Sequence, residues 1–279
     1  MGRDTFRAIS LGAGVQSTTM VLMAVCGEFC PQPDCAIFAD TGWEPPEVYR
    51  QLEKLEDLAK ASGFPVHRCS AGDIRQDHLD SAGDDSGRSF MPFFVLSENG
   101  AHESHGIVRR KCSTEYKLSP VKRKIKELLG FDPRKPWPRT APHIEQWIGF
   151  STDEAQRCKP APESWITTVF PLIEFGMSRS DCVQYCNDVG FGVPVGSSCI
   201  GCPFHSPAYW ARMAKERPDE FEDACRFDEE MRERGGLPGI RGVPYLHSSR
   251  KPLRDVAMDY GGGEQLDLLE HGCGGMCDT

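Results

Sequence analysis

The sequence predicts an α/β protein: a parallel sheet with helices on both faces, followed by a smaller, mainly helical C-terminal region that contains cysteines. Short apolar strands alternate with helices in the order β-α-β-α-β over residues 6–68. The first strand, 6–11, leads into a loop of small residues that opens a helix over 17–25. In such sheets ligands bind beyond the carboxyl ends of the strands, so we expect the site at that edge.

The remaining elements follow from the same patterns. Strands are predicted at 35–39 and 66–68, and the helix between them has apolar residues on one face, at Val48, Leu52, Leu55 and Leu58. Further along we expect a helix at 120–129, a strand at 144–150, an extended segment at 165–172, and helices at 181–188, 208–215 and 219–234. We place an α/β domain at 1–175, with a long mobile loop at 70–108, and a helical region at 176–279.

Composition excludes several classes of protein. The formal net charge of the 279 residues is −9, so the chain is not a globally basic nucleic-acid binder. No apolar run approaches the roughly 20 residues of a membrane helix, and no signal-peptide pattern precedes the first strand, so we expect a cytoplasmic protein. Thirteen cysteines in a reducing compartment indicate metal or redox chemistry rather than a disulfide framework.

The loop after the first strand has the character of a phosphate cradle. Glycines allow a close backbone approach, hydroxyls add donors, and a helix N-terminus favours negative charge. The expected contacts are Ser10, Gly12, Gly14, Gln16, Ser17 and Thr18. The loop matches neither GxxxxGK[ST] nor GxGxxG. Asp40 and Thr41, after the second strand, would share this edge and could serve Mg²⁺ or a ribose, although Asp40 could equally cap the next helix.

A basic segment occupies residues 109–126. Its cations face a single acid, Glu115, and are Arg109, Arg110, Lys111, Lys117, Lys122, Arg123, Lys124 and Lys126. Such a cluster can neutralise phosphates, or it can be a solvated helix face. Cys112 lies within it, where the positive field favours the thiolate.

Cys199-x-x-Cys202-Pro203 is a metal or cluster motif. One such pair is incomplete, and Cys112, Cys273 and Cys277 are the candidates for the remaining ligands. A redox dithiol and a zinc site that includes His205 are the alternatives. Cys182 and Cys186 share one helix face, which core packing explains.

Together these residues resemble the PP-loop adenine-nucleotide α-hydrolase superfamily, in its phosphoadenosine-phosphosulfate (PAPS) reductase-like branch. The family loop S-G-G-x-D-S corresponds to Gly12–Ser17, with Gly12 in place of its Ser and Gln16 in place of its Asp. Asp40-Thr41-Gly42-Trp43-Glu44-Pro45-Pro46-Glu47-Val48-Tyr49 resembles the reductase segment D-T-G-x-x-F-P-E-T-Y. Arg110-x-Cys112 with Lys117 and Pro120 resembles its R-x-C…K…P segment.

The resemblance implies a Rossmann-like (HUP/PP-loop) sheet that binds ATP with Mg²⁺, and a [4Fe-4S] cluster. It implies cluster ligation by Cys112, Cys199, Cys202 and Cys273, with Cys277 as a mobile catalytic thiol; the opposite roles of Cys273 and Cys277 stay open. Asp40 and Lys117 would also be catalytic, and Thr41, Arg109 and Arg110 would bind the nucleotide.

The implied activity is that of an ATP-dependent sulfurtransferase. It would adenylate an acceptor, release pyrophosphate, and insert sulfur supplied as sulfide or by a cysteine desulfurase. The acceptor could be a nucleic acid that binds the basic segment 109–126. A homodimer is compatible with the sequence. The alternatives are a reductase that releases sulfite from adenylyl sulfate or PAPS, and a nucleotide-binding, non-catalytic subunit of a modification complex.

Overall fold

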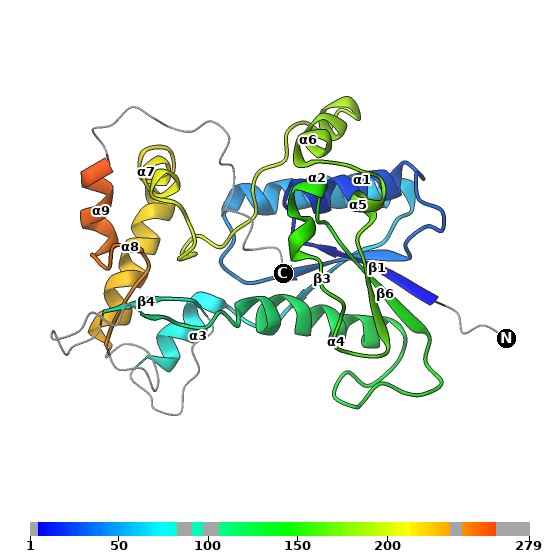
Figure 1. The fold of residues 1–279 in the computed structure, drawn as a ribbon, viewed down its shortest axis with the longest axis horizontal. Coiled ribbons are helices and arrows are strands. Elements are labelled where there is room, and N and C mark those ends of the chain that lie inside the picture. Colours follow the sequence, from blue (N-terminus) through cyan, green and yellow to red (C-terminus); the bar gives the residue numbers. More distant parts are fainter. Residues whose placement is uncertain (1–4, 83–90, 97–105, 235–241, 261–279) are drawn as a thin grey trace.

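The computed structural model describes residues 5–82, 91–96, 106–234 and 242–260. Its centre is a parallel sheet, as the sequence predicts, and the five strands lie in the order β3-β2-β1-β6-β7 (Figure 1). The strands are β1 (Thr5–Leu11), β2 (Cys35–Asp40), β3 (Val66–Ser70), β6 (His143–Ile148) and β7 (Ile166–Val169). The expected extended segment 165–172 ends early, because Pro171 begins the short helix α5 (Pro171–Glu174).

Helices cover both faces of this sheet (Figure 1). One face packs against α1 (Val15–Val25), α2 (Pro46–Ser62) and α6 (Arg179–Asp188), and the other against α4 (Ser119–Leu128). The alternation of strand side chains accounts for this: Ile9 joins the α1 side of the core, whereas Ala8 joins the α4 side. On α2 the last buried position is Ala59, while the expected Leu58 is 40% exposed.

A second unit surrounds the C-terminal helices. Helices α3 (Ile74–Ser81), α7 (Pro207–Glu216), α8 (Pro218–Glu233) and α9 (Leu253–Tyr260) accompany a small antiparallel sheet of β4 (Phe94–Leu96), β5 (Gly106–Ile107) and β8 (Val243–Tyr245). The expectation of a loop throughout 70–108 is therefore wrong in part. Asp73 caps α3 by accepting from the backbone amides of Arg75 and Gln76, and β4 is stabilised by pairing with β8.

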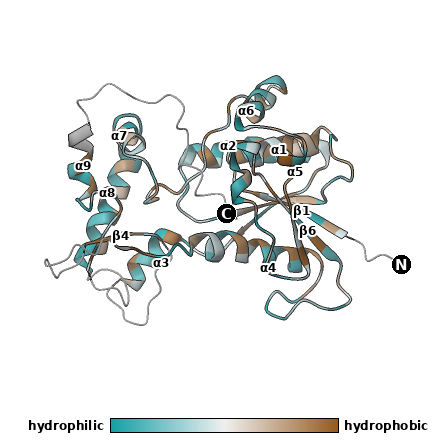
Figure 2. Cartoon of the chain, in the orientation of Figure 1, coloured by the Kyte–Doolittle hydropathy of each residue, from teal (hydrophilic) through white to brown (hydrophobic). Residues whose placement is uncertain are grey.

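The packing divides the chain differently from the expected boundary at residue 175. Cys182 and Cys186 on α6 are buried in the same core as α1, as the packing interpretation of this pair predicts. Conversely, β4 pairs with β8, so part of the 70–108 segment belongs with the C-terminal helices. Figure 2 shows the hydrophobic colouring of α1 and the central strands and the more hydrophilic colouring of α8. Within the described residues, no helix is long and apolar enough to cross a membrane.

Candidate functional site

The candidate site lies where the sheet order reverses, between β1 and β6. From β1 the chain proceeds to β2 and β3 toward one edge of the sheet, and from β6 it proceeds to β7 toward the other edge. This reversal leaves a crevice at the carboxyl ends of β1 and β6. Gly149, directly after β6, is needed there: a Cβ at this position would lie 2.9 Å from the Ser17 amide nitrogen. The small residue lets β6 approach the N-terminus of α1.

The loop from β1 to α1 forms the predicted cradle. Ala13 adopts a left-handed conformation, with φ of +56°, and Gly14 is the N-cap of α1. No side chain caps this helix, and its first turn carries no acid, so the N-terminal field is directed at the crevice. The Ser17 hydroxyl stays within the loop, accepting from the Gly12 amide at 3.2 Å and donating to the Gly14 carbonyl at 3.3 Å.

A cavity opens in front of this loop, and we call it the cradle cavity. Its walls come from the ends of β1, β2 and β6 and from the start of α4: Ser10, Leu11, Gly12, Ser17, Ile37, Ala39, Glu44, Lys117, Leu118, Val121, Ile148 and Gly149. Three of the six cradle residues predicted from sequence thus line it. Gly14, the N-cap of α1, is not among the lining residues, and Thr18 is completely buried.

Gln16 turns away from the cradle cavity. Its amide donates to Glu154 Oε2 at 2.9 Å and accepts from Arg179 Nη1 at 3.0 Å, and the side chain is only 2% exposed. Glu154 lies on the 3-10 helix η2 (Thr152–Arg157), and also pairs with Arg157. A carboxylate from after β6 is therefore held next to the position at which the family loop has Asp.

Asp40 does not line the cradle cavity. Its Oδ1 accepts from the Gly42 amide and from the Tyr49 hydroxyl, both at 2.8 Å, which fixes the turn after β2. The expected catalytic and metal role of Asp40 stays a prediction. Thr41 is buried and lies toward the cysteines, because its Oγ1 is 3.2 Å from Cys199 Sγ.

The carboxylate that does line the cradle cavity is Glu44, which sequence reasoning passed over. It is 4% exposed, accepts from Thr41 Oγ1 at 3.2 Å, and lies 3.8 Å from Cys199 Sγ. Burial raises its pKa, and the Lys117 ammonium opposes that rise. The signal that could have identified Glu44 from sequence is its position in the D-T-G-W-E segment, because a carboxylate among apolar residues needs a polar partner.

Cys112, Cys199 and Cys202 line one further cavity, which we call the thiol cavity. Its other walls are Thr41, Ile74, Met91, Pro92, Arg110, Ser113, Lys117, Pro203 and Phe204. Cys112 directly precedes the π-helix η1 (Ser113–Leu118), and the other two cysteines flank a tight turn in which the Cys202 amide donates to the Cys199 carbonyl at 3.0 Å. The structure thus brings together three of the four predicted cluster ligands. Cys273 and Cys277 lie outside the described residues.

Lys117 is shared by the cradle and thiol cavities. The wide turn of η1, a feature often found at functional sites, carries it between them. Burial raises the pKa of Cys112, of Cys199 and of Cys202, the last to about 12, and in each case the Lys117 cation opposes the effect. The lysine therefore stabilises negative charge on either side of it.

The donor set of the thiol cavity suits a group that takes thiolates. Buried thiolates need a cation, and iron or zinc would supply one. Within the described part of the chain, however, no three His, Cys, Asp or Glu side chains stand close enough to hold a single metal ion. His205 is not turned toward the thiols: its Nε2 contacts the Cys199 carbonyl at 3.0 Å, and its ring stacks on Tyr209.

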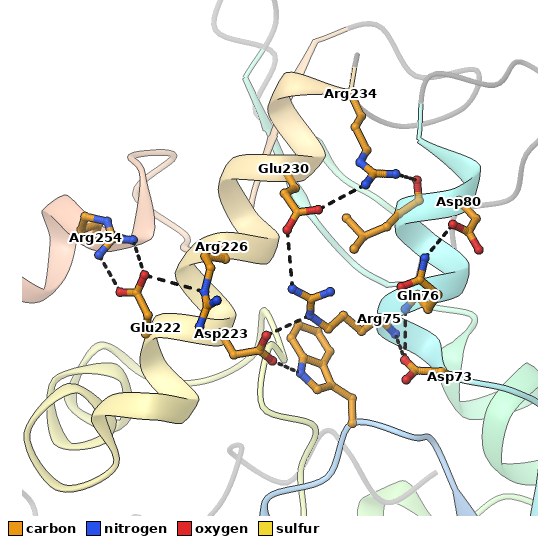
Figure 3. A network of polar contacts seen from close by, with 12 residues as sticks. Asp73, Arg75, Gln76, Asp80, Glu222, Asp223, Arg226, Glu230, Arg234 and Arg254 are labelled. Carbon is orange, nitrogen blue, oxygen red and sulfur yellow. Dashed lines mark hydrogen bonds and ion pairs between the residues drawn. The ribbon is translucent and has the colours of Figure 1, made fainter.

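Trp43 joins the turn after β2 to the cysteine turn. Its carbonyl accepts from the Ile200 amide at 2.9 Å, and its ring lies against Gly201. The indole Nε1 donates to Asp223 Oδ2 at 2.7 Å on α8. Figure 3 shows Asp223 pairing with Arg75 of α3, at 3.1 Å, and Arg75 reaching Glu230 at 3.7 Å. This network positions the cysteine turn relative to the central sheet.

The basic segment is only partly available for binding. Lys122 pairs with Glu163 at 2.5 Å, and Lys126 donates to the Lys135 carbonyl at 2.6 Å. Arg110 lines the thiol cavity, whereas Arg109 is exposed and lines none of the described cavities. A nucleic-acid surface over 109–126 stays a prediction.

Comparisons with known proteins give distant similarities. No protein-family model and no curated protein matches the chain. Among solved structures it is similar to phosphoadenylyl-sulfate (PAPS) reductase from Candida auris in a phosphate complex, at 15% identity and a TM-score of 0.38, over 68% of this chain and 73% of that one. It is also similar to the U34-tRNA thiolase NcsA from Methanococcus maripaludis with its [4Fe-4S] cluster, at 11% identity and a TM-score of 0.38, over 95% and 84%.

One of these solved structures is a PAPS reductase and the other is a tRNA thiolase. Both identities and both scores are low. The activity is therefore inferred from the geometry of the site itself.

Proposed function

We propose that this chain is an ATP-dependent sulfurtransferase of the PP-loop type. The observation that carries the proposal is the position of Lys117, whose side chain lines both the cradle cavity and the thiol cavity. A phosphate cradle and a cluster of thiols that share one cation fit a reaction in which nucleotide chemistry and sulfur chemistry occur side by side.

In the proposed reaction, an acceptor oxygen attacks the α-phosphorus of ATP, and the bond from that phosphorus to the bridging oxygen of pyrophosphate breaks. A hydrosulfide sulfur then attacks the carbon that carries the adenylated oxygen. The carbon–oxygen bond breaks, AMP leaves, and the hydrosulfide proton passes to the released phosphates. The uncapped N-terminus of α1 and Lys117 would stabilise the charge that develops on the phosphates.

Cys112, Cys199 and Cys202 would hold the [4Fe-4S] cluster, with Cys273 or Cys277 as the fourth ligand. When bound, such a cluster could hold the sulfur donor at an iron only where the fourth thiolate is released. The choice of a cluster over a single zinc ion rests on the resemblance of the Cys199-x-x-Cys202 motif to that of iron–sulfur proteins. Mg²⁺ would enter with ATP, and Glu44 is the nearest carboxylate in the cavity wall.

The experiment is anaerobic purification, iron and sulfide analysis, and an assay for ATP conversion to AMP and pyrophosphate with sulfide and candidate acceptors. We expect iron and sulfide in equal amounts and a visible chromophore that Cys199→Ala abolishes. A colourless protein with stoichiometric zinc would reject the cluster. Sulfite release from a sulfonucleotide without ATP would favour the reductase, and intact ATP binding without turnover under any condition would favour a non-catalytic subunit.

Lys117→Met tests the shared cation. Removing one preorganised donor at a developing charge commonly lowers kcat by about 10²–10³-fold, and we expect a loss of that order with a smaller change in the Kd for ATP. Lys117→Arg should retain part of the rate. The matched control is Lys135→Met, a lysine that is 79% exposed and lines neither cavity.

A further inference from the structure

A third cavity lies at the carboxyl ends of β6 and β7, and we call it the β6–β7 cavity. It shares Leu118 and Ile148 with the cradle cavity, and Arg110 with the thiol cavity. Its volume is about 760 Å³, against about 70 Å³ for the cradle cavity. Pockets for small ligands typically measure about 300–1,000 Å³, so this space is large enough for a complete small molecule.

One wall of this cavity is flat and aromatic. Phe150 and Phe170 stack with ring centroids 5.7 Å apart and an angle of 7° between their planes. Phe150 is buried and forms the floor, with the Arg157 guanidinium 4.5 Å from its ring centroid. Phe170 is partly exposed and lines the cavity, so a planar group that enters could contact its ring.

The same cavity has an excess of cations over available acids. Arg110, Lys122, Arg157 and Lys159 line it, and of these Lys122 is already paired with Glu163 at 2.5 Å. Of its two acids, Glu154 is already bound to Gln16 and Arg157, and Asp153 accepts from the Arg179 amide at 2.6 Å. Arg157 Nη2 is buried and, within the described structure, has no hydrogen-bond partner, so it could donate to a ligand that enters.

We propose that the β6–β7 cavity binds the acceptor, and that this acceptor presents a planar heteroaromatic ring carrying an anionic group. The ring stacks on Phe170, and the anion is placed between Lys159 and Arg157. This inference rests on the proposed function, because the cavity becomes an acceptor site only if ATP is cleaved beside it. A free nucleotide and an unpaired base within a strand both have this chemistry.

In the test, the ATP site is saturated before any acceptor probe is added, so that the probes can bind only elsewhere. With α,β-methylene-ATP at saturation, binding of the four ribonucleoside 5′-monophosphates and of a mixed-sequence single-stranded oligonucleotide is measured by calorimetry. We expect at least one probe to bind. Phe170→Ala should weaken it by about tenfold, as loss of a base-stacking ring commonly does. Lys159→Ala should weaken it as well, whereas Lys135→Ala, an exposed lysine elsewhere, should not.

The outcomes separate the two proposals. A monophosphate that binds alone identifies a free nucleotide, and binding of the oligonucleotide alone identifies a strand. Failure of every probe, full competition by α,β-methylene-ATP, or unchanged binding to Phe170→Ala would overturn the acceptor site. Wild-type protein that binds no α,β-methylene-ATP would overturn the proposed function instead. Retained α,β-methylene-ATP binding by Phe170→Ala shows that the variant is folded.

Discussion

Gly201 lies so close to Trp43 that a Cβ at position 201 would stand 2.0 Å from the indole Cη2. The glycine is the second residue between the paired cysteines, and the indole belongs to the turn after β2. The shape of the thiol cavity therefore depends on a contact between two segments that are distant in the sequence. The contact between Gly201 and Trp43 also explains why this C-x-x-C motif carries Gly at its second variable position.

Gly201→Ala should displace the indole and disturb the thiol cavity. Overpacking a tight contact typically costs about 1–3 kcal/mol of unfolding free energy. Urea unfolding would measure the loss, and iron content would report on the cysteines. Trp43→Phe in the same background removes the clashing ring atoms and should recover part of both. If Gly201→Ala unfolds like the parent protein, the close packing of these residues is wrong.

The contact between Gln16 and Glu154 allows a charge-exchange experiment. Gln16→Glu keeps the shape of the side chain but places a second carboxylate where an amide now donates to Glu154 Oε2. Repulsion between the two buried carboxylates, offset in part by the Arg179 guanidinium 3.0 Å from the position-16 oxygen, should lower stability and weaken ATP binding.

Combining Gln16→Glu with Glu154→Gln reverses the polarity of the pair and should restore ATP binding. Equilibrium dialysis with α,β-methylene-ATP measures the Kd, and thermal unfolding follows stability. Glu154→Gln alone serves as the control for the lost Arg157 contact. Equal affinity for ATP in Gln16→Glu and in the double variant would mean that Glu154 does not act on the cradle.

Asp223 ties Trp43 and Arg75 to α8 (Figure 3). Asp223→Ala leaves the indole N–H without its acceptor, and an unsatisfied buried donor costs about 1–3 kcal/mol. We expect lower stability and faster loss of iron, with ATP affinity less affected because the cradle lies on the central sheet. Glu222→Ala on the same helix is the surface control, since Glu222 is 43% exposed. Equal loss in both variants would contradict the linking role of Asp223.

His78 should make stability depend on pH. Burial lowers its pKa to about 4, and the Met91 amide donates to its Nε2 at 3.0 Å, which requires the neutral ring. The unfolded chain takes up a proton below pH 6.5, while the folded chain does so only near pH 4.

Stability should therefore fall as the pH drops from 6.5 to 4, by up to about 1.4 kcal/mol per pH unit for this one group. His78→Gln should be less stable at pH 7 and should show a shallower pH dependence. Urea unfolding at pH 7 and pH 5 gives the comparison, and His205 and His247 contribute equally to both proteins. Parallel pH profiles would rule out His78 as a source.

The parallel sheet was predictable because the spacing of apolar residues that marks each strand and helix lies within that element's own short stretch of sequence. The loop after β1 was predictable for the same reason. The β4, β5 and β8 sheet was not, because pairing between Phe94 and Tyr245 depends on contacts 151 residues apart. The helix α3 was missed although Asp73, a typical N-cap, precedes it.

The candidate site was predictable to a similar extent. The family motifs grouped Cys112 with Cys199 and Cys202 and singled out Lys117, and all four line one cavity, while their roles stay predictions. The residues missed or misplaced depend on tertiary packing. Glu44 reaches the cradle cavity because the turn after β2 folds back, and Asp40 is turned to Tyr49 by that same turn.

The proposed cluster would also have a consequence for the life of the protein in the cell. Cys112 precedes α4 on one face of the central sheet, whereas Cys199 and Cys202 lie in a turn hydrogen-bonded to Trp43, whose indole in turn donates to Asp223 on α8. A cofactor held by all three would fasten these segments together as a covalent brace. Iron starvation or oxidative damage would then shorten the lifetime of the polypeptide as well as its activity, so its abundance would follow the iron supply of the cell.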